Sequence, residues 1–150
     1  MSVWFEGSSE IESDIQQVKD ALENQGEHYV ELVRLMPSLT SVELVEQGSD
    51  FVTIKTNEGL MKRTSIAKRI DANSVVVDYD EEYLGGKMVV VKSHVMDKFT
   101  TIDTGIQHRT VISGVEAPGF IGFFYRNFGS SNIGNALLRS YKAYFERKNQ

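Results

Sequence analysis

The sequence lacks cysteine altogether. This absence excludes disulfide bonds, thiolate metal sites and a cysteine nucleophile, and it fits a reducing compartment. No apolar run approaches the roughly 18 residues that a membrane-spanning helix needs, and the N-terminal residues have neither the basic nor the apolar region of a secretory signal. We therefore expect a soluble cytoplasmic protein without an integral membrane segment.

The sequence also lacks any excess of basic charge. Its formal net charge is −5 and its isoelectric point is about 5.2. Phosphate binding needs clustered lysine and arginine, so this balance argues against nucleic acid as a partner. A chain of 150 residues is long enough to bury one substantial core, and neither a repeat nor a linker divides it. We expect residues 1–150 to form a single domain.

The N-terminal part predicts a short strand followed by helical segments. Val3 to Ser8 carries the pattern of a strand, and Ser13 is the residue expected to cap the following helix. The helical pattern is interrupted at residues 24–26 and then continues to Pro37, which ends it because proline cannot continue a helix. We expect either a helix pair or one kinked helix in this part of the chain.

The C-terminal part predicts one long amphipathic helix. Apolar residues recur there at steps of three and four, and charged residues occupy the other side. The apolar set consists of Ile133, Leu137, Tyr141, Tyr144 and Phe145. Upstream lies a denser apolar block that must be covered by the rest of the fold or by a ligand. The glycine-rich run at 129–134 predicts a break or bend in this helical region.

Between residues 38 and 115 the apolar period changes to two, which is typical of β-strands. Turn sequences such as Asn57-Glu58-Gly59 divide this stretch into six strands. From Val75 to Tyr83 the apolar residues alternate with acidic ones, which predicts one buried face and one solvated face. Consecutive strands joined by short turns form an antiparallel meander.

The segment Ile11 to Val18 leads a strand into a helix, and the segment Asn135 to Glu146 gives the last helix its apolar pattern. With the order of strand, helix pair, six strands and long helix, these segments resemble the START-like (SRPBCC) superfamily, which includes polyketide cyclases and lipid-transfer domains. The resemblance implies an α+β helix-grip fold, in which a curved antiparallel sheet of about seven strands wraps around the C-terminal helix. It also implies a cavity between sheet and helix that holds a hydrophobic small molecule.

Aromatic, methionine and aliphatic side chains are the predicted lining of this cavity. Ligand pockets are mostly apolar with a few polar groups, and methionine adapts to irregular shapes. The simpler interpretation is that these side chains only fill the core. The predicted ligand-binding residues are Met61, Tyr79, Tyr83, Met88, Met96, His108, Ile112, Phe120, Phe124, Phe128, Leu137 and Tyr141.

Three side chains are candidates for acid–base chemistry, namely His94, His108 and Tyr83. His94 shares its strand parity with Met96, and His108 shares its parity with Ile112, so either imidazole would reach a cavity that those faces line. The simpler interpretation places both histidines at the surface or in the core. Both faces of the strand that carries His94 are apolar, so the alternation of apolar residues does not predict which face packs against the helix.

Charged residues of the strands are expected to face solvent. Arg63 and Arg69 share one parity, and one of them would be able to reach a ligand carboxylate, but charged side chains are seldom buried. The acidic run at 78–82 lacks the glycine and the spaced glutamate of a calcium loop. The run at 129–134 lacks the lysine of a phosphate loop, and apart from His28 with Glu31 the histidines lack the spacing of a metal site. We expect neither a metal nor a cofactor.

These observations favour a protein that binds or transports a hydrophobic small molecule, such as a lipid or a polyketide-like compound. One alternative is an enzyme of the polyketide cyclase or dehydratase type, which needs two or more ionisable groups that converge on one point of the cavity. A second alternative is a protein-interaction module, which needs an exposed apolar patch. The sequence predicts neither the identity of the ligand nor the oligomeric state.

Overall fold

The computed structural model describes residues 2–36, 39–85, 88–117 and 130–147. The helices are α1 (Ile15–Glu23), α2 (Gln25–Arg34) and α4 (Ser130–Arg147). The strands are β1 (Val3–Ile11), β2 (Val42–Gln47), β3 (Val52–Thr56), β4 (Gly59–Ile70), β5 (Ser74–Gly85), β6 (Met88–Ile102) and β7 (Gly105–Glu116). Phe120, Phe124 and Phe128 lie outside the described residues.

The seven strands form one antiparallel sheet in the order β1-β7-β6-β5-β4-β3-β2. Strands β2 to β7 are neighbours both in sequence and in space, as a meander requires, and β1 joins the free edge of β7. The predicted helix-grip fold, with a helix pair after the first strand and a long C-terminal helix, is therefore confirmed.

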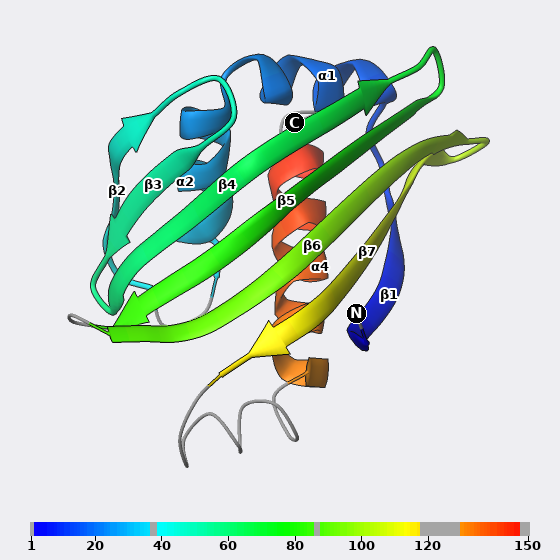
Figure 1. Cartoon of the computed structure of the whole chain (residues 1–150). Helices are drawn as coiled ribbons and strands as arrows, with labels where there is room; N and C mark the ends of the chain where they lie inside the picture. Colours follow the sequence, from blue (N-terminus) through cyan, green and yellow to red (C-terminus); the bar gives the residue numbers. More distant parts are fainter. Residues whose placement is uncertain (1, 37–38, 86–87, 118–129, 148–150) are drawn as a thin grey trace.

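The three described helices lie on one side of the curved sheet, and α4 runs along that side beneath the central strands (Figure 1). We call this side of the sheet the inner face and the opposite side the outer face. The main core joins inner-face residues of β5 and β6, such as Val75 and Phe99, to Tyr141, Tyr144 and Phe145 of α4. Val75, Val77 and Tyr79 are buried, as the predicted alternation of β5 requires.

The helix ends differ in detail from the prediction. The N-cap of α1 is Asp14, whose carboxylate accepts from the Gln17 backbone N–H, so the predicted cap at Ser13 was wrong by one residue. Asn24 ends α1 and caps α2, and the two helices are therefore a pair rather than one kinked helix. Helix α4 runs without interruption through Gly134, where a side chain would overlap the ring of Phe5. The glycine at 134 thus permits close packing and does not break the helix.

A bulge in β4 separates the two arginines that the sequence placed on one face. The pairing of β4 with β5 shifts between Thr64 and Ala67, and Ser65 has a positive φ of 53°. A bulge of this kind reverses which side chains point inward beyond it. Arg63 is therefore buried at the inner face, whereas Arg69 is exposed. The expectation that Arg63 faces solvent was wrong.

None of the described helices is both long and apolar enough to cross a membrane.

Candidate functional site

A cavity of about 240 Å³ lies between the inner face of the sheet and the helices α2 and α4. Apolar side chains of both helices line it, including Leu32 and Val33 of α2 and Ile133 and Leu137 of α4. Trp4 of β1 adds an aromatic ring. This mixture of aliphatic and aromatic walls with a few polar groups is typical of small-molecule sites.

Three adjacent strands each place one polar residue on the floor of this cavity. Arg63 of β4 is paired in register with Glu81 of β5, and Glu81 is paired with Ser93 of β6. All three line the cavity, and we call them the polar row. The cross-strand pairs on either side of the row are largely apolar. They are Met61 with Tyr83 and Val95 with Ile112.

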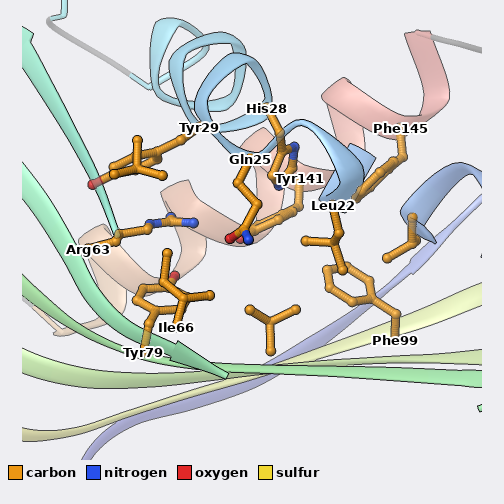
Figure 2. Close-up of a pocket in the computed structure, with 13 residues that line it drawn as sticks. Leu22, Gln25, His28, Tyr29, Arg63, Ile66, Tyr79, Phe99, Tyr141 and Phe145 are labelled. Carbon is orange, nitrogen blue, oxygen red and sulfur yellow. The ribbon is translucent and has the colours of Figure 1, made fainter. Parts of the chain in front are cut away.

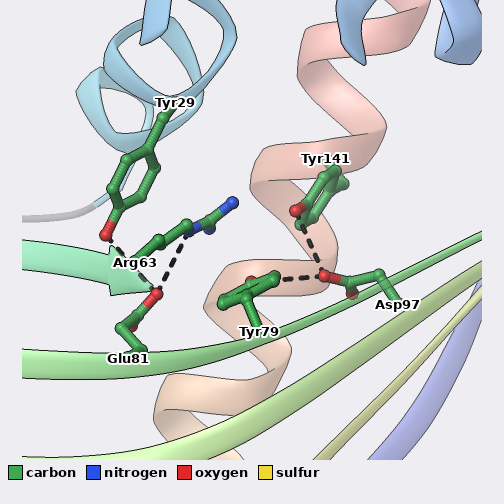
Figure 3. Close-up of polar contacts among 6 residues, drawn as sticks. All are labelled: Tyr29, Arg63, Tyr79, Glu81, Asp97 and Tyr141. Atoms are coloured by element: carbon green, nitrogen blue, oxygen red, sulfur yellow. Dashed lines mark hydrogen bonds and ion pairs between the residues drawn. The ribbon is translucent and has the colours of Figure 1, made fainter. Parts of the chain in front are cut away.

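Arg63 is enclosed by aromatic rings and one carboxylate. Its side chain is 8% exposed, and its guanidinium carbon lies 3.8 Å from the ring centroid of Tyr29 and 4.2 Å from that of Tyr79. Its Nε donates to Oε2 of Glu81 at 3.3 Å, and the Tyr29 hydroxyl donates to the same oxygen at 3.4 Å (Figure 3). The ion pair and the two ring faces together stabilise a cation that burial alone would make costly.

A second, much smaller void of about 10 Å³ lies next to Arg63, which is space for about one water molecule. Figure 2 shows the guanidinium of Arg63 and the amide of Gln25 pointing toward the middle of this void. Tyr79 and Tyr141 also line it. Arg63 thus lies between the void and the large cavity, because it lines both.

A second polar cluster surrounds Asp97 of β6, which is 1% exposed. Its Oδ2 accepts from the hydroxyls of Tyr79 at 3.3 Å and Tyr141 at 3.2 Å (Figure 3). Its Oδ1 lies 2.8 Å from Nε2 of His108, and the His108 ring stacks on Phe99 with centroids 4.5 Å apart. We call Asp97, His108, Tyr79 and Tyr141 the closed network, because neither Asp97 nor His108 lines the cavity or the void.

The closed network changes the acidity of its members. Burial alone would raise the pKa of Asp97, but the hydrogen bond and the charge of His108, together with Thr110 and Arg63, outweigh burial, and the pKa of Asp97 lies below its ordinary value. Burial raises the pKa of Tyr141, and the Asp97 charge raises it further. Burial also raises the pKa of Tyr79 and of Tyr29 well above the ordinary value. These tyrosines therefore act as hydrogen-bond donors in the folded protein.

The predicted ligand-binding residues are distributed over several places. Those that line the cavity are Met61, Tyr83, Ile112 and Leu137, while Tyr79 and Tyr141 line the void. Met96 does not line the cavity but a groove on the outer face, beside Asp78. Phe120, Phe124, Phe128 and the side chain of Met88 lie outside the described part of the structure.

The three acid–base candidates do not converge on one point of the structure. His94 lies on the outer face, with Nε2 2.5 Å from Asp78 Oδ1 and Nδ1 2.9 Å from Asp80 Oδ1. His108 is enclosed in the closed network, and only Tyr83 reaches the cavity. The Tyr83 hydroxyl donates to the backbone oxygen of Glu58 at 2.7 Å, and burial and the Glu58 charge raise the pKa of Tyr83. The alternation of β6 misplaced His94 and Met96 because both faces of that strand are apolar.

Sequence reasoning missed most of the polar row. Arg63 was noted, but solvent exposure was expected, and Glu81 was assigned to an acidic solvated run. Glu81 shares its parity with Tyr79 and Tyr83, and this alternation was the available signal that it points inward. Ser93 gave no signal of its own, because serine is common on either face of a sheet.

The comparisons with known proteins agree on the fold. No protein-family model matches the chain, and no curated protein matches it in sequence. Solved structures do match. A conserved protein from Geobacillus kaustophilus superimposes with a TM-score of 0.64 at 16% identity, over 95% of this chain and 94% of that one. The aromatase/cyclase Zhui from a Streptomyces species gives 0.55 at 16% identity, over 97% and 94%.

The chain has the START-like fold. The human StarD13 lipid transfer and protein localization domain is also similar, with a TM-score of 0.56 at 11% identity over 93% of this chain and 75% of that one. In this fold, the cavity and the polar row lie between the curved sheet and the C-terminal helix.

Proposed function

We propose that this START-like chain binds or transports a hydrophobic small molecule in the cavity between the sheet and α4. The observation that carries the proposal is the volume of about 240 Å³ lined by mostly apolar side chains of α2, α4 and the inner face. The proposal includes a single ligand-binding domain over residues 1–150 and a cytoplasmic location. The similarity to a lipid-transfer domain and to an aromatase/cyclase supports it at the level of the fold.

The size of the cavity is adequate for a ligand. An apolar protein cavity of about 150 Å³ is known to hold benzene, so a volume of 240 Å³ exceeds what one aromatic ring needs. A well-packed protein interior contains few voids larger than one water molecule. An apolar volume of this size would lower stability if its only role were structural, because cavities remove packing contacts.

The cyclase alternative depends on ionisable groups that converge on one point. The predicted trio does not provide them, since His94 is on the outer face and His108 is enclosed with Asp97. Among the described residues, the ionisable groups that line the cavity are Glu58, Arg63, Glu81, Tyr29 and Tyr83. In the described structure Arg63, Glu81 and Tyr29 bond to one another, which suits binding better than proton transfer.

The interaction-module alternative requires a continuous exposed apolar patch. The large exposed apolar side chains of the described structure belong to β1, the end of α2, β2 and the end of β4. They are Val3, Leu35, Leu44, Val45 and Ile70. Exposed apolar residues spread over several elements are normal for a protein surface. A concentration-dependent native mass would favour this alternative.

The test compares the native mass of purified protein with its denatured mass and then measures binding of a dye for apolar pockets. We expect a co-purified small molecule or dye binding. Leu137→Trp places an indole into the cavity and should weaken binding at least about tenfold, because the added volume displaces ligand. Arg139→Trp is the matched control, since residue 139 is exposed on the same helix. Equal binding by both variants, or no adduct and no dye binding, would contradict the proposal.

A further inference from the structure

The polar row leaves two hydrogen-bonding groups unengaged at the cavity. Oε2 of Glu81 accepts from both Arg63 and Tyr29. Within the described part of the chain, neither Oε1 of Glu81 nor the hydroxyl of Ser93 has a hydrogen-bond partner. The two residues are cross-strand neighbours and both line the cavity. The Glu81 side chain is 24% exposed, and neither atom is among the fully buried unpaired atoms of the described structure, so both atoms are accessible to a ligand in the cavity.

The charges of the row favour a neutral ligand group. A carboxylate bound here would lie against the Glu81 carboxylate, and an ammonium group would lie close to the Arg63 guanidinium. Like charges in a partly buried site repel more strongly than in water. A hydroxyl group avoids both costs, because it donates through its hydrogen and accepts through its oxygen. It would donate to Oε1 of Glu81 and accept from the Ser93 hydroxyl.

The volume of the cavity limits the rest of the ligand. Scaling from the six carbons of benzene in a cavity of about 150 Å³, a volume of 240 Å³ holds about ten non-hydrogen atoms. This is one ring with a short chain, or a branched chain of similar size. The flanking pairs of Met61 with Tyr83 and Val95 with Ile112 offer apolar contact on both sides of the polar row.

We propose that the ligands of this cavity are small neutral alcohols or phenols of about ten non-hydrogen atoms, whose hydroxyl group is held between Glu81 and Ser93. This inference rests on the proposed function and narrows it to a chemical class. Arg63 acts indirectly, because its ion pair and the Tyr29 hydroxyl occupy Oε2 of Glu81 and leave Oε1 available to the ligand.

The experiment measures binding of three matched compounds by titration calorimetry. They are para-propylphenol, propylbenzene and para-ethylbenzoate, which present a hydroxyl, no polar group and a carboxylate. The wild-type chain should bind the phenol roughly tenfold more tightly than propylbenzene and should bind the benzoate most weakly. Ser93→Ala should reduce the preference for the phenol several-fold and leave propylbenzene binding unchanged. Ser113→Ala is the control, because residue 113 lies on β7 and does not line the cavity.

Four other results would contradict the inference or the proposed function. Equal affinities for the phenol and propylbenzene would overturn this inference and leave the proposed function intact. Tightest binding of the benzoate would also overturn it and would indicate an anion held by Arg63. Equal loss of preference in the Ser93 and Ser113 variants would remove the role of Ser93. Failure of all three compounds to bind would contradict the proposed function itself.

Discussion

The polar row and the closed network share the inner face of one sheet and resemble each other in composition. Each has a charged residue flanked by tyrosines, with Arg63 beside Tyr29 and Tyr79, and Asp97 beside Tyr79 and Tyr141. They differ in what their polar groups contact. Asp97 and His108 are buried, and both oxygens of Asp97 have hydrogen-bonding partners. In the described part of the chain, Glu81 has one oxygen with two donors and one with none.

This difference separates a structural cluster from a binding cluster. In the closed network both oxygens of Asp97 are paired. Nδ1 of His108 has no hydrogen-bond partner among the described residues, but His108 does not line the cavity, so the network presents no free group to a ligand there. A row with unpaired groups beside an apolar cavity is incomplete until a ligand or water supplies the partner. We therefore assign the Asp97 cluster to stability and the Arg63–Glu81–Ser93 row to recognition.

The largest expected effect is the loss of Asp97. Asp97→Leu leaves the hydroxyls of Tyr79 and Tyr141 and the Nε2 of His108 without their acceptor in a sealed site. We expect a loss of about 3–5 kcal/mol in the free energy of unfolding, measured by chemical denaturation. Asp97→Asn keeps an acceptor in place and should cost less. If both variants were as stable as the wild type, the structural assignment of the closed network would fail.

The alkaline limit of stability should come from the buried tyrosines. Their folded-state pKa values are raised, so their stabilising contribution is complete below the ordinary value of about 10 and is lost as the pH rises beyond it. Titration followed by tyrosinate absorbance and circular dichroism should show Tyr29, Tyr79 and Tyr141 ionising together with unfolding. Ionisation of every tyrosine near pH 10 with the fold intact would contradict this placement.

A smaller effect is expected in acid. The folded-state pKa of Asp97 lies below its ordinary value of 3.8, so its stabilising contribution is present above about pH 4 and is lost as the pH falls through the folded value. Asp97→Asn has no carboxyl group at this position. The stability difference between wild type and this variant should therefore shrink below about pH 4, measured by denaturation at a series of pH values. A difference that is constant with pH would argue against an ionised Asp97.

The smallest effect is expected on the outer face. His94→Ala removes the contacts with Asp78 and Asp80, which are exposed, and should cost at most about 1 kcal/mol of stability. Binding in the cavity should not change, because His94 points away from it. A large loss of binding in this variant, measured with the same dye, would show that the outer face takes part in ligand recognition.

The fold was predictable from the sequence because its signals are local and repeated. The period of two in β2 to β7, the turn residues between them and the period of 3.6 in α4 each appear several times along the chain. A misjudged residue, such as the helix cap at Ser13 rather than Asp14, does not change the order of the elements. The apolar pattern of Val75, Val77 and Tyr79 also gave the correct inner face of β5.

The site was less predictable because it depends on single residues and on register. The bulge at Ser65 places Arg63 and Arg69 on opposite faces of the sheet, and the residue type at that position does not predict a bulge. The pairing of Arg63, Glu81 and Ser93 joins residues from three strands, and alternation alone does not give their register. His108 was placed on the correct strand face, but its partner Asp97 is contributed by the neighbouring strand.

The most direct test follows the methyl signals of the protein by nuclear magnetic resonance while para-propylphenol is added. Met61 of the cavity and Met96 of the outer groove provide matched reporters on the two faces of the sheet. We expect the signals of Met61, Ile112 and Leu137 to shift with a common saturation curve, while those of Met96 and Ile70 stay in place. Shifts confined to Met96, or no shift at Met61, Ile112 and Leu137, would contradict a ligand site between the sheet and α4.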